Sequence, residues 1–215
     1  LALPVPKLMK RSVDLAILML TGLVTLPLIG VIAILVKLTS RGPVFFRQER
    51  IGKDGREFWM WKFRTMVADA ERALQEHLDR NDHARREWNT RRKLRNDPRV
   101  TTIGRWLRRT SLDELPQLFN VLQGRMSIVG PRPHAIYHNE VYKNDVDQYM
   151  LRHKVKPGIT GWAQVNGLRG EIRTIDNMKD RVKHDLYYIE NWSLWLDIKI
   201  IVMTLFRGLV HKNAY

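Results

Sequence analysis

Cysteine is absent from the 215 residues of the chain, and carboxylates are few relative to bases. Without cysteine there can be no disulfide, no thiolate nucleophile, and no zinc or iron–sulfur site with cysteine ligands. Lysine and arginine number 37 against 22 aspartates and glutamates, which gives a net charge of +15 at pH 7. This surplus favours polyanionic partners such as nucleic acid, anionic lipid or a phosphorylated substrate. With 44% hydrophobic residues, the chain is too apolar to be a disordered basic tail.

Charge is also missing from residues 15–36, a run of 22 residues. As a straight helix, this run would reach about 33 Å, the thickness of the hydrocarbon core of a bilayer. Bases flank it on both sides: Lys7, Lys10, Arg11, Lys37 and Arg41. Because both flanks are basic, the positive-inside rule hardly distinguishes which end of the run would face the cytoplasm.

Pro27 stands near the middle of the apolar run, with Gly30 shortly after it. Proline removes a backbone hydrogen bond and can bend a helix sharply. A helix that enters the membrane, breaks at Pro27 and returns to the same face would place both basic flanks in one layer of anionic headgroups. We therefore predict a re-entrant anchor over residues 1–40. A straight transmembrane helix, a buried core helix and a signal peptide are the alternatives.

The remaining residues predict an α+β domain with a small sheet and several helices. Residues 44–50 and 57–63 have the character of two strands, and Lys53-Asp54-Gly55 supplies the turn of a hairpin. Residues 67–95 alternate acids and bases, which indicates a solvated helix or helix pair. Residues 126–129 favour a further short strand.

Apolar residues recur at helical spacing over residues 194–209 and predict an amphipathic helix. Four polar residues interrupt the pattern: Asp197, Lys199, Thr204 and Arg207. The apolar side either packs on the domain core or lies in the membrane interface, with Trp192 and Trp195 at headgroup depth.

Two adjacent carboxylates, Asp113 and Glu114, suggest the start of a helix. In one register, Ser111 and Glu114 form a capping box, but Pro116 then falls at the fifth helical residue and costs a hydrogen bond. In the other, Asp113 is the N-cap and Pro116 falls where no amide is needed. The helix dipole would then keep Asp113 ionised.

Three arginines precede this acid pair: Arg105, Arg108 and Arg109. An ionised aspartate beside a second carboxylate, ringed by arginines, suits phosphoryl transfer. One acid can hold Mg²⁺ while the other attacks phosphorus, and the arginines neutralise charge on the phosphate oxygens. A helix cap beside a solvated basic face is the alternative.

Two loops rich in glycine and proline follow. Residues 130–133 hold Arg132 between two prolines, and a rigid guanidinium suits bidentate phosphate recognition. An ordinary proline turn with an exposed arginine is the alternative. Residues 156–162 form a second such loop, which alone indicates no more than a turn.

Together these segments resemble the bacterial sugar transferases, the monotopic polyprenyl-phosphate phosphoglycosyl transferases. The resemblance covers essentially the whole chain. The apolar helix with basic flanks comes first, as in the family, and five motifs come after it in the family's order: PVFFRQ at 43–48, KFRTM at 62–66, TSLDELPQ at 110–117, GPRP at 130–133 and KPGITG at 156–161. Residues 134–135, 161–167, 187–192 and 212–215 look more like the undecaprenyl-phosphate glucose-1-phosphate transferases than the galactose enzymes. Larger members carry a membrane bundle and a further domain first, so we expect this chain to be the C-terminal part of a longer protein.

The resemblance implies a two-step reaction. Asp113 matches the nucleophile that attacks the β-phosphate of a UDP-sugar, expels UMP and holds the phosphosugar covalently until undecaprenyl phosphate accepts it. Glu114 matches the partner acid associated with Mg²⁺, and Arg108 matches an arginine near the transferred phosphate. Three further cations are expected to contact phosphate or uridine: Lys62, Arg64 and Arg132. Glucose is the expected hexose, and UDP-galactose or another UDP-sugar is the alternative donor.

The resemblance also implies a location. Residues 1–40 would anchor the chain in lipid of the bacterial inner membrane, and residues 41–215 would form a catalytic domain on the cytoplasmic face, with 67–95 as a charged helical insertion. The family's anchor breaks at Ser-Pro, whereas here Leu26 precedes Pro27, so a hydroxyl cap would have to come from Thr25 or elsewhere. We expect no nucleic-acid partner, and a homo-oligomer is compatible with the family. A function of another class is a non-enzymatic, membrane-anchored basic module that binds nucleic acid or anionic lipid, which leaves the acid pair without a role.

Overall fold

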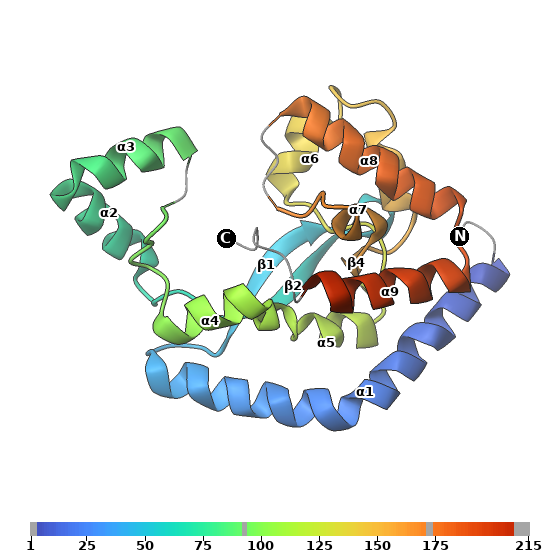
Figure 1. The fold of residues 1–215 in the computed structure, drawn as a ribbon, viewed down its shortest axis with the longest axis horizontal. Helices are drawn as coiled ribbons and strands as arrows, with labels where there is room; N and C mark the ends of the chain where they lie inside the picture. The colour runs from blue at the N-terminus through green and yellow to red at the C-terminus, as the bar shows by residue number, and fades with distance from the viewer. Residues whose placement is uncertain (1–3, 92–93, 171–173, 209–215) are drawn as a thin grey trace.

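The computed structural model describes residues 4–91, 94–170 and 174–208. Its helices surround two small sheets (Figure 1), which confirms the predicted α+β class. The elements in chain order are α1 Pro4–Thr39, β1 Phe45–Ile51, the 3₁₀ turn η1 Lys53–Gly55, β2 Glu57–Phe63, α2 Ala70–Arg80, α3 Asp82–Arg91, α4 Thr102–Thr110, the 3₁₀ turn η2 Leu112–Glu114, α5 Gln117–Leu122, β3 Ser127–Val129, α6 Ile136–Tyr142, the 3₁₀ helix η3 Tyr149–Lys154, β4 Gly158–Thr160, α7 Trp162–Val165, α8 Ile175–Glu190 and α9 Leu194–Gly208.

The predicted hairpin is present, since β1 and β2 pair antiparallel with Phe45 opposite Phe63. The turn between them places Asp54 at φ 55° and Gly55 at φ 75°, backbone conformations that aspartate and glycine tolerate. Phe58 and Met60 of β2 are buried against residues of α5 and the chain after it. The hairpin therefore supplies one wall of the domain core.

A second, parallel sheet joins β3 to β4. The sequence predicted only a turn over residues 156–162, the second loop rich in glycine and proline. That prediction missed β4, which lies within this segment. A side chain on Gly158 would place its Cβ 2.1 Å from the backbone nitrogen of Gly130. Glycine is therefore required for the close backbone approach.

The charged segment forms the predicted helix pair, α2 and α3, with residues 92 and 93 outside the described residues. Leu74, Leu78 and Ala84 are buried between the two helices and form a small core of their own. Figure 1 shows the pair projecting from the rest of the chain beside α4.

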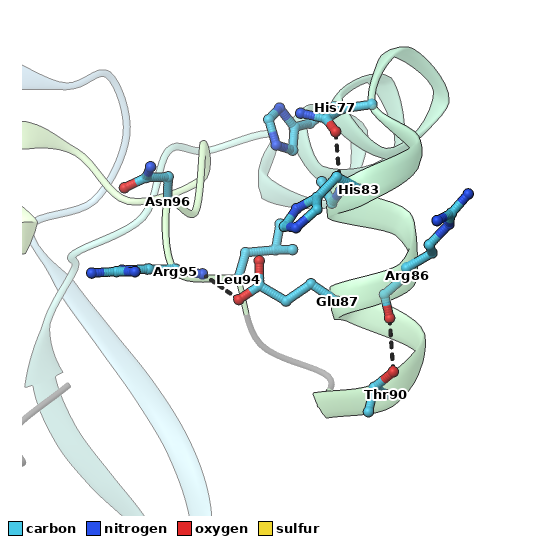
Figure 2. Close-up of a pocket in the computed structure, with 10 residues that line it drawn as sticks. His77, His83, Arg86, Glu87, Thr90, Leu94, Arg95 and Asn96 are labelled. Carbon is cyan, nitrogen blue, oxygen red and sulfur yellow. Dashed lines mark hydrogen bonds between the residues drawn. The ribbon is translucent and has the colours of Figure 1, made fainter.

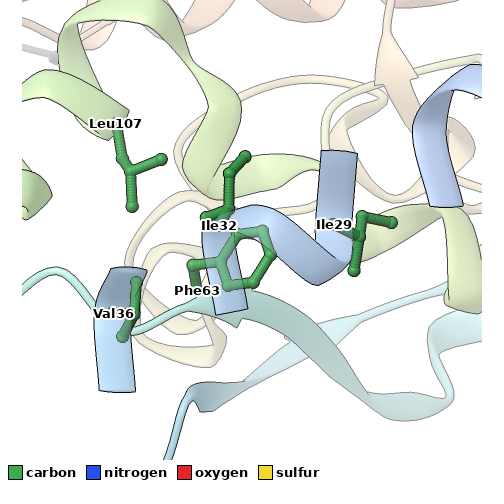
Figure 3. Close-up of a cluster of buried hydrophobic side chains, with 5 residues drawn as sticks. All are labelled: Ile29, Ile32, Val36, Phe63 and Leu107. Carbon is green, nitrogen blue, oxygen red and sulfur yellow. The ribbon is translucent and has the colours of Figure 1, made fainter. Parts of the chain in front are cut away.

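Helix α1 is long and apolar enough to cross a membrane, and its ribbon bends near the middle (Figure 1). Pro27 lies inside the helix and supplies no amide for the helical hydrogen bond. Three side chains of α1 pack against Phe63 and Leu107 (Figure 3): Ile29, Ile32 and Val36. Other apolar side chains of the helix are exposed, including Leu20, Leu23 and Val24. Only three residues of the apolar run are buried, so α1 is no buried core helix.

Both ends of α1 are attached to the same domain. Near its start, Lys10 Nζ lies 2.7 Å from a carboxylate oxygen of Asp197, and Asp14 accepts hydrogen bonds from the Ser127 hydroxyl at 2.8 and 2.9 Å. At its end, the Arg64 guanidinium donates to the Ser40 carbonyl at 2.7 Å. The bent helix thus begins and ends against one body, and its re-entry into a membrane stays a prediction.

Helix α9 packs on the core, as one of the two alternatives predicted, and exposes other apolar side chains; its place in a membrane interface stays a prediction. Ile200 is fully buried in the core with residues of β3 and α8, whereas Trp195, Leu205 and Phe206 are exposed. Asp197, one of the four polar residues in the apolar pattern, is buried and paired with Lys10. Leu209, the last residue of the predicted helix, and residues 212–215 lie outside the described residues.

Candidate active site

The acid pair lies in the η2 turn between α4 and α5. Helix α4 ends at Thr110, and Ser111 turns the chain with a left-handed φ of 60°. Both predicted registers are wrong, because α5 begins only at Gln117 and Pro116 occupies its N-cap position. Ser111 makes no side-chain capping bond, and Asp113 lies inside a 3₁₀ turn. Pro116 suits this position, since the first turn of a helix needs no amide partner.

Glu114 is clamped by two cations. Its Oε1 lies 2.8 Å from Lys62 Nζ and 2.6 Å from an Arg132 guanidinium nitrogen, and its Oε2 accepts from Arg132 at 3.2 Å. Burial alone would raise the pKa of Glu114, but the charges and hydrogen bonds of Arg132 and Lys62 outweigh it and hold the pKa well below its usual range. Glu114 is therefore ionised at neutral pH.

Asp113 is buried, with 8% of its surface exposed, and its carboxylate has no hydrogen-bond partner among the described residues. Burial, and then the charge of Glu114, raise the pKa of Asp113, while Lys62, Arg108 and Arg132 oppose the rise. The expectation that a helix dipole fixes its ionisation was wrong, because Asp113 caps no helix.

The predicted ring of arginines is formed only in part. Arg105 and Arg109 are exposed on the outer side of α4, whereas Arg108 is half-buried and donates through Nε to the Thr65 hydroxyl at 2.8 Å. Lys62 and Arg132, from distant parts of the chain, supply the other nearby charges. The cations around the pair thus come from three segments of the chain.

Arg64 lies two residues beyond Lys62 but points elsewhere. Its guanidinium donates to the carbonyl and hydroxyl of Ser40 at the end of α1, at 2.7 and 2.8 Å. A Cβ on Gly42 would clash with it at 2.3 Å. The structure therefore gives Arg64 a role in holding α1, and its contact with a substrate stays a prediction.

A buried ion pair supports the loop that carries Arg132. Arg152 donates to the Arg132 carbonyl at 2.9 Å and pairs with Asp185 of α8 at 2.6 Å. The side chains of Arg152 and Asp185 are only 1% and 2% exposed. Sequence reasoning missed this pair, since 33 residues separate its members and neither lies in a recognisable motif.

Arg50 was also missed. Burial, and then the charge of Arg132, lower its pKa to about 10, although Glu114 opposes the fall. Its guanidinium donates to the Gln48 side chain at 2.6 Å from the same face of β1. The alternation of strand residues was the available signal, because it places residues 48 and 50 on one face. Arg50 thus adds a fourth cation to the surroundings of Glu114.

Two cavities differ in their position relative to the acid pair: one borders it and the other lies apart from it. One of about 160 Å³ is lined by Ser111, Glu114 and Arg169 together with apolar residues of α5 and β4. A larger one of about 690 Å³ lies between α2, α3 and residues 94–96 (Figure 2), and neither acid lines it. The smaller cavity therefore offers space for a ligand beside the acid pair.

The acid pair fits Mg²⁺ as a site in which the protein supplies two carboxylates and the substrate and water supply the other ligands. Within the parts of the chain that the structure describes, no three His, Asp or Glu side chains gather as a metal-binding group. Mg²⁺ commonly binds one or two carboxylates and completes its shell with substrate phosphates and water. Asp113, whose oxygens are unengaged, and Oε2 of Glu114 offer that donor set.

Comparison with known proteins decides the family. The model of the family described as bacterial sugar transferase matches residues 5–211. The chain belongs to the bacterial sugar transferase family. The family resemblance inferred from the ordered motifs is thereby confirmed.

The relatives include proteins named for two different UDP-sugar donors. The chain is 52% identical over 211 residues to a UDP-glucose:undecaprenyl-phosphate glucose-1-phosphate transferase of Escherichia coli K12, covering 98% of this chain and 42% of that protein. It is 54% identical over 201 residues to a protein of the same name from Xanthomonas campestris pv. campestris, covering 94% and 38%. A UDP-galactose-lipid carrier transferase of Erwinia amylovora is 43% identical, covering 97% and 42%. This bacterial sugar transferase therefore spans about two fifths of the length of these relatives.

Proposed function

We propose that the chain transfers glucose 1-phosphate from UDP-glucose to undecaprenyl phosphate and releases UMP. The observation that carries the proposal is the η2 turn, where a buried carboxylate with no hydrogen-bond partner among the described residues lies beside a glutamate clamped by Lys62 and Arg132. Relatives about half identical in sequence bear the corresponding names. The reaction also gives the acid pair a role, which a basic binding module would leave unexplained.

In the first step, a carboxylate oxygen of Asp113 attacks the β-phosphorus of the donor. The bond from that phosphorus to the bridging oxygen breaks, and UMP leaves with the oxygen and the bonding electrons. Lys62, Arg108 and Arg132 surround the position where charge on the phosphate oxygens grows. In the second step, a phosphate oxygen of undecaprenyl phosphate attacks the same phosphorus and the Asp113 carboxylate is released.

Mg²⁺, when bound, would neutralise charge on the donor diphosphate. Asp113 and Glu114 are the protein ligands that we propose for it. Glu114 also holds Lys62 and Arg132 in place, so it orders the cations of the site whether or not the ion is bound.

The membrane setting follows from the two exposed apolar faces. The bent α1 and the helix α9 both expose large apolar side chains, and Lys10 joins their beginnings through Asp197. We propose that both lie in the cytoplasmic leaflet of the inner membrane, where the phosphate of the acceptor lies at headgroup level. The active site can then meet a lipid-linked acceptor and a soluble donor together.

The proposed reaction is tested by release of UMP. The chain, reconstituted in vesicles with undecaprenyl phosphate and Mg²⁺, is incubated separately with UDP-glucose and UDP-galactose. We expect UMP with UDP-glucose and much less with UDP-galactose. Faster release with UDP-galactose would replace the proposed hexose, and no release with either donor would overturn the proposed reaction.

The pH dependence of the reaction provides a second prediction. Asp113 must be ionised to attack, so the rate falls as the pH drops through its pKa, which burial and Glu114 raise above 3.8. Glu114→Gln removes a charge that raises this pKa, and Lys62→Gln removes one that lowers it. We expect the acid limb of the pH–rate profile to move down in the first variant and up in the second, by about one pH unit each.

The position of the acid limb is the readout in both variants, because their rates will also fall for other reasons. Glu140→Gln, an exposed change on α6, is the matched control and should leave the limb in place. Movement of both limbs in the same direction would contradict the assignment of Asp113 as the titrating nucleophile.

A further inference from the structure

A basic cavity of about 260 Å³ lies between the start of α1, the end of η3 and strand β3. Six cationic side chains line it: Lys7, Lys10, Arg11, Lys53, Lys154 and Lys156. Asp14 is the one carboxylate in its lining, and neither Asp113 nor Glu114 belongs to it. The cavity is therefore separate from the acid pair.

The single acid does not balance the cations. Asp14 is 2% exposed and accepts hydrogen bonds from Ser127 and the Ile128 amide, while Lys10 is neutralised by Asp197 at 2.7 Å. Within the described parts of the chain, the Arg11 guanidinium donates only to the neutral backbone carbonyls of Val121 and Leu122.

Three lysines of the cavity make no ion pair with any carboxylate in the described parts of the chain: Lys7, Lys154 and Lys156. Burial, and then the charge of Arg11, lower the pKa of Lys156. These groups would be stabilised by an anion in the space between them.

The position of the cavity indicates what kind of anion it takes. Lys7 and Lys10 lie on the same turns of α1 as Leu8 and Met9, whose side chains are 70% and 48% exposed. The cavity thus lies where the exposed apolar face of α1 begins. Basic pockets beside membrane helices on the cytoplasmic side bind the headgroups of anionic lipids.

We propose that this cavity binds the phosphate headgroup of an anionic phospholipid from the surrounding leaflet. Liquid water occupies about 30 Å³ per molecule, so the cavity has room for a phosphodiester and not merely for a small ion. The inference rests on the membrane placement proposed above and not on the transfer reaction. A bound headgroup would fix the start of α1, β3 and η3 against the membrane surface.

The test measures which lipid the full chain retains. The detergent-solubilised protein is mixed with equal amounts of phosphatidylglycerol and phosphatidylcholine, isolated, and analysed for bound lipid by mass spectrometry. The wild-type chain should be enriched in phosphatidylglycerol. Lys154→Gln/Lys156→Gln should lower the enrichment by about tenfold or more, since each lysine near an anionic surface contributes about 1 kcal/mol and 1.4 kcal/mol is a factor of ten.

Two further variants separate the cavity from net charge and from misfolding. Lys179→Gln/Lys183→Gln removes two exposed charges from α8, neither of which lines the cavity, and should retain the enrichment. Lys7→Gln changes an exposed residue of α1 that cannot disturb the core, and should lower the enrichment in part.

Three outcomes would overturn the site. If the α8 variant lost as much phosphatidylglycerol enrichment as the cavity variants, the preference would come from net charge. If the cavity variants kept the wild-type enrichment, the cavity would not be the binding site. Retention that inorganic phosphate abolishes would assign the cavity to a free anion. Failure of the wild-type chain to associate with neutral vesicles would overturn the membrane placement itself, whereas UMP release tests the reaction independently.

Discussion

Asp113→Asn is expected to lower UMP release by about four orders of magnitude or more, which is the scale on which loss of a covalent nucleophile acts. Asparagine has nearly the size of aspartate, and no hydrogen bond of Asp113 is lost among the described residues. The fold and membrane binding should therefore persist. The missing component is the ionised oxygen that forms the bond to phosphorus.

Two measurements accompany the rate. The wild-type chain, incubated with UDP-glucose without acceptor, should gain the mass of a phosphohexose, and the Asp113→Asn chain should not. Asp54→Asn is the matched control, because this exposed aspartate has a left-handed φ of 55° that asparagine also tolerates. Turnover of Asp113→Asn near that of the control would refute the nucleophile.

Arg152→Met is expected to reduce the free energy of unfolding by about 3–5 kcal/mol, because it leaves the buried carboxylate of Asp185 without its cation. Removal of both charges in Arg152→Met/Asp185→Leu should cost less than the single change, since two apolar side chains can replace a buried ion pair. Urea unfolding of the solubilised chain, followed by tryptophan fluorescence, measures the difference.

The control for this prediction is an exposed ion pair of similar length. Lys143 pairs with Glu140 at 2.6 Å on the surface, and Lys143→Met should change the free energy of unfolding by about 0.5 kcal/mol or less. If Lys143→Met and Arg152→Met reduced the free energy of unfolding by similar amounts, burial would not determine the cost of losing the cation. A double variant less stable than Arg152→Met would contradict the account of the unpaired carboxylate.

Local patterns predicted those features of the fold that local geometry decides. The Lys53-Asp54-Gly55 turn gave the hairpin because its residues tolerate left-handed backbone conformations. The alternating charges gave α2 and α3, and the adjacency of Asp113 and Glu114 gave the acid pair. In each case the residues that determine the feature are neighbours in the chain.

The surroundings of the acid pair depend on contacts that no short window contains. Lys62 and Glu114 are 52 residues apart, and they meet only because β2 passes the η2 turn. Arg105 and Arg109 are nearer in sequence, but α4 buries Gly104 and Leu107, so these arginines point outward. The buried pairing of Asp197 is a similar case, because its partner Lys10 lies 187 residues earlier in the chain.

The attachment of α1 at both ends limits how this protein can be simplified for solution work. A chain that begins after residue 40 would remove Lys10 from the buried Asp197, which is 1% exposed, and would uncover Phe63 and Leu107. It would also take Asp14 away from Ser127 and the amide of β3. Part of α1 thus belongs to the folded core, so we expect a chain without the helix to expose apolar surface and to be less stable than the full chain.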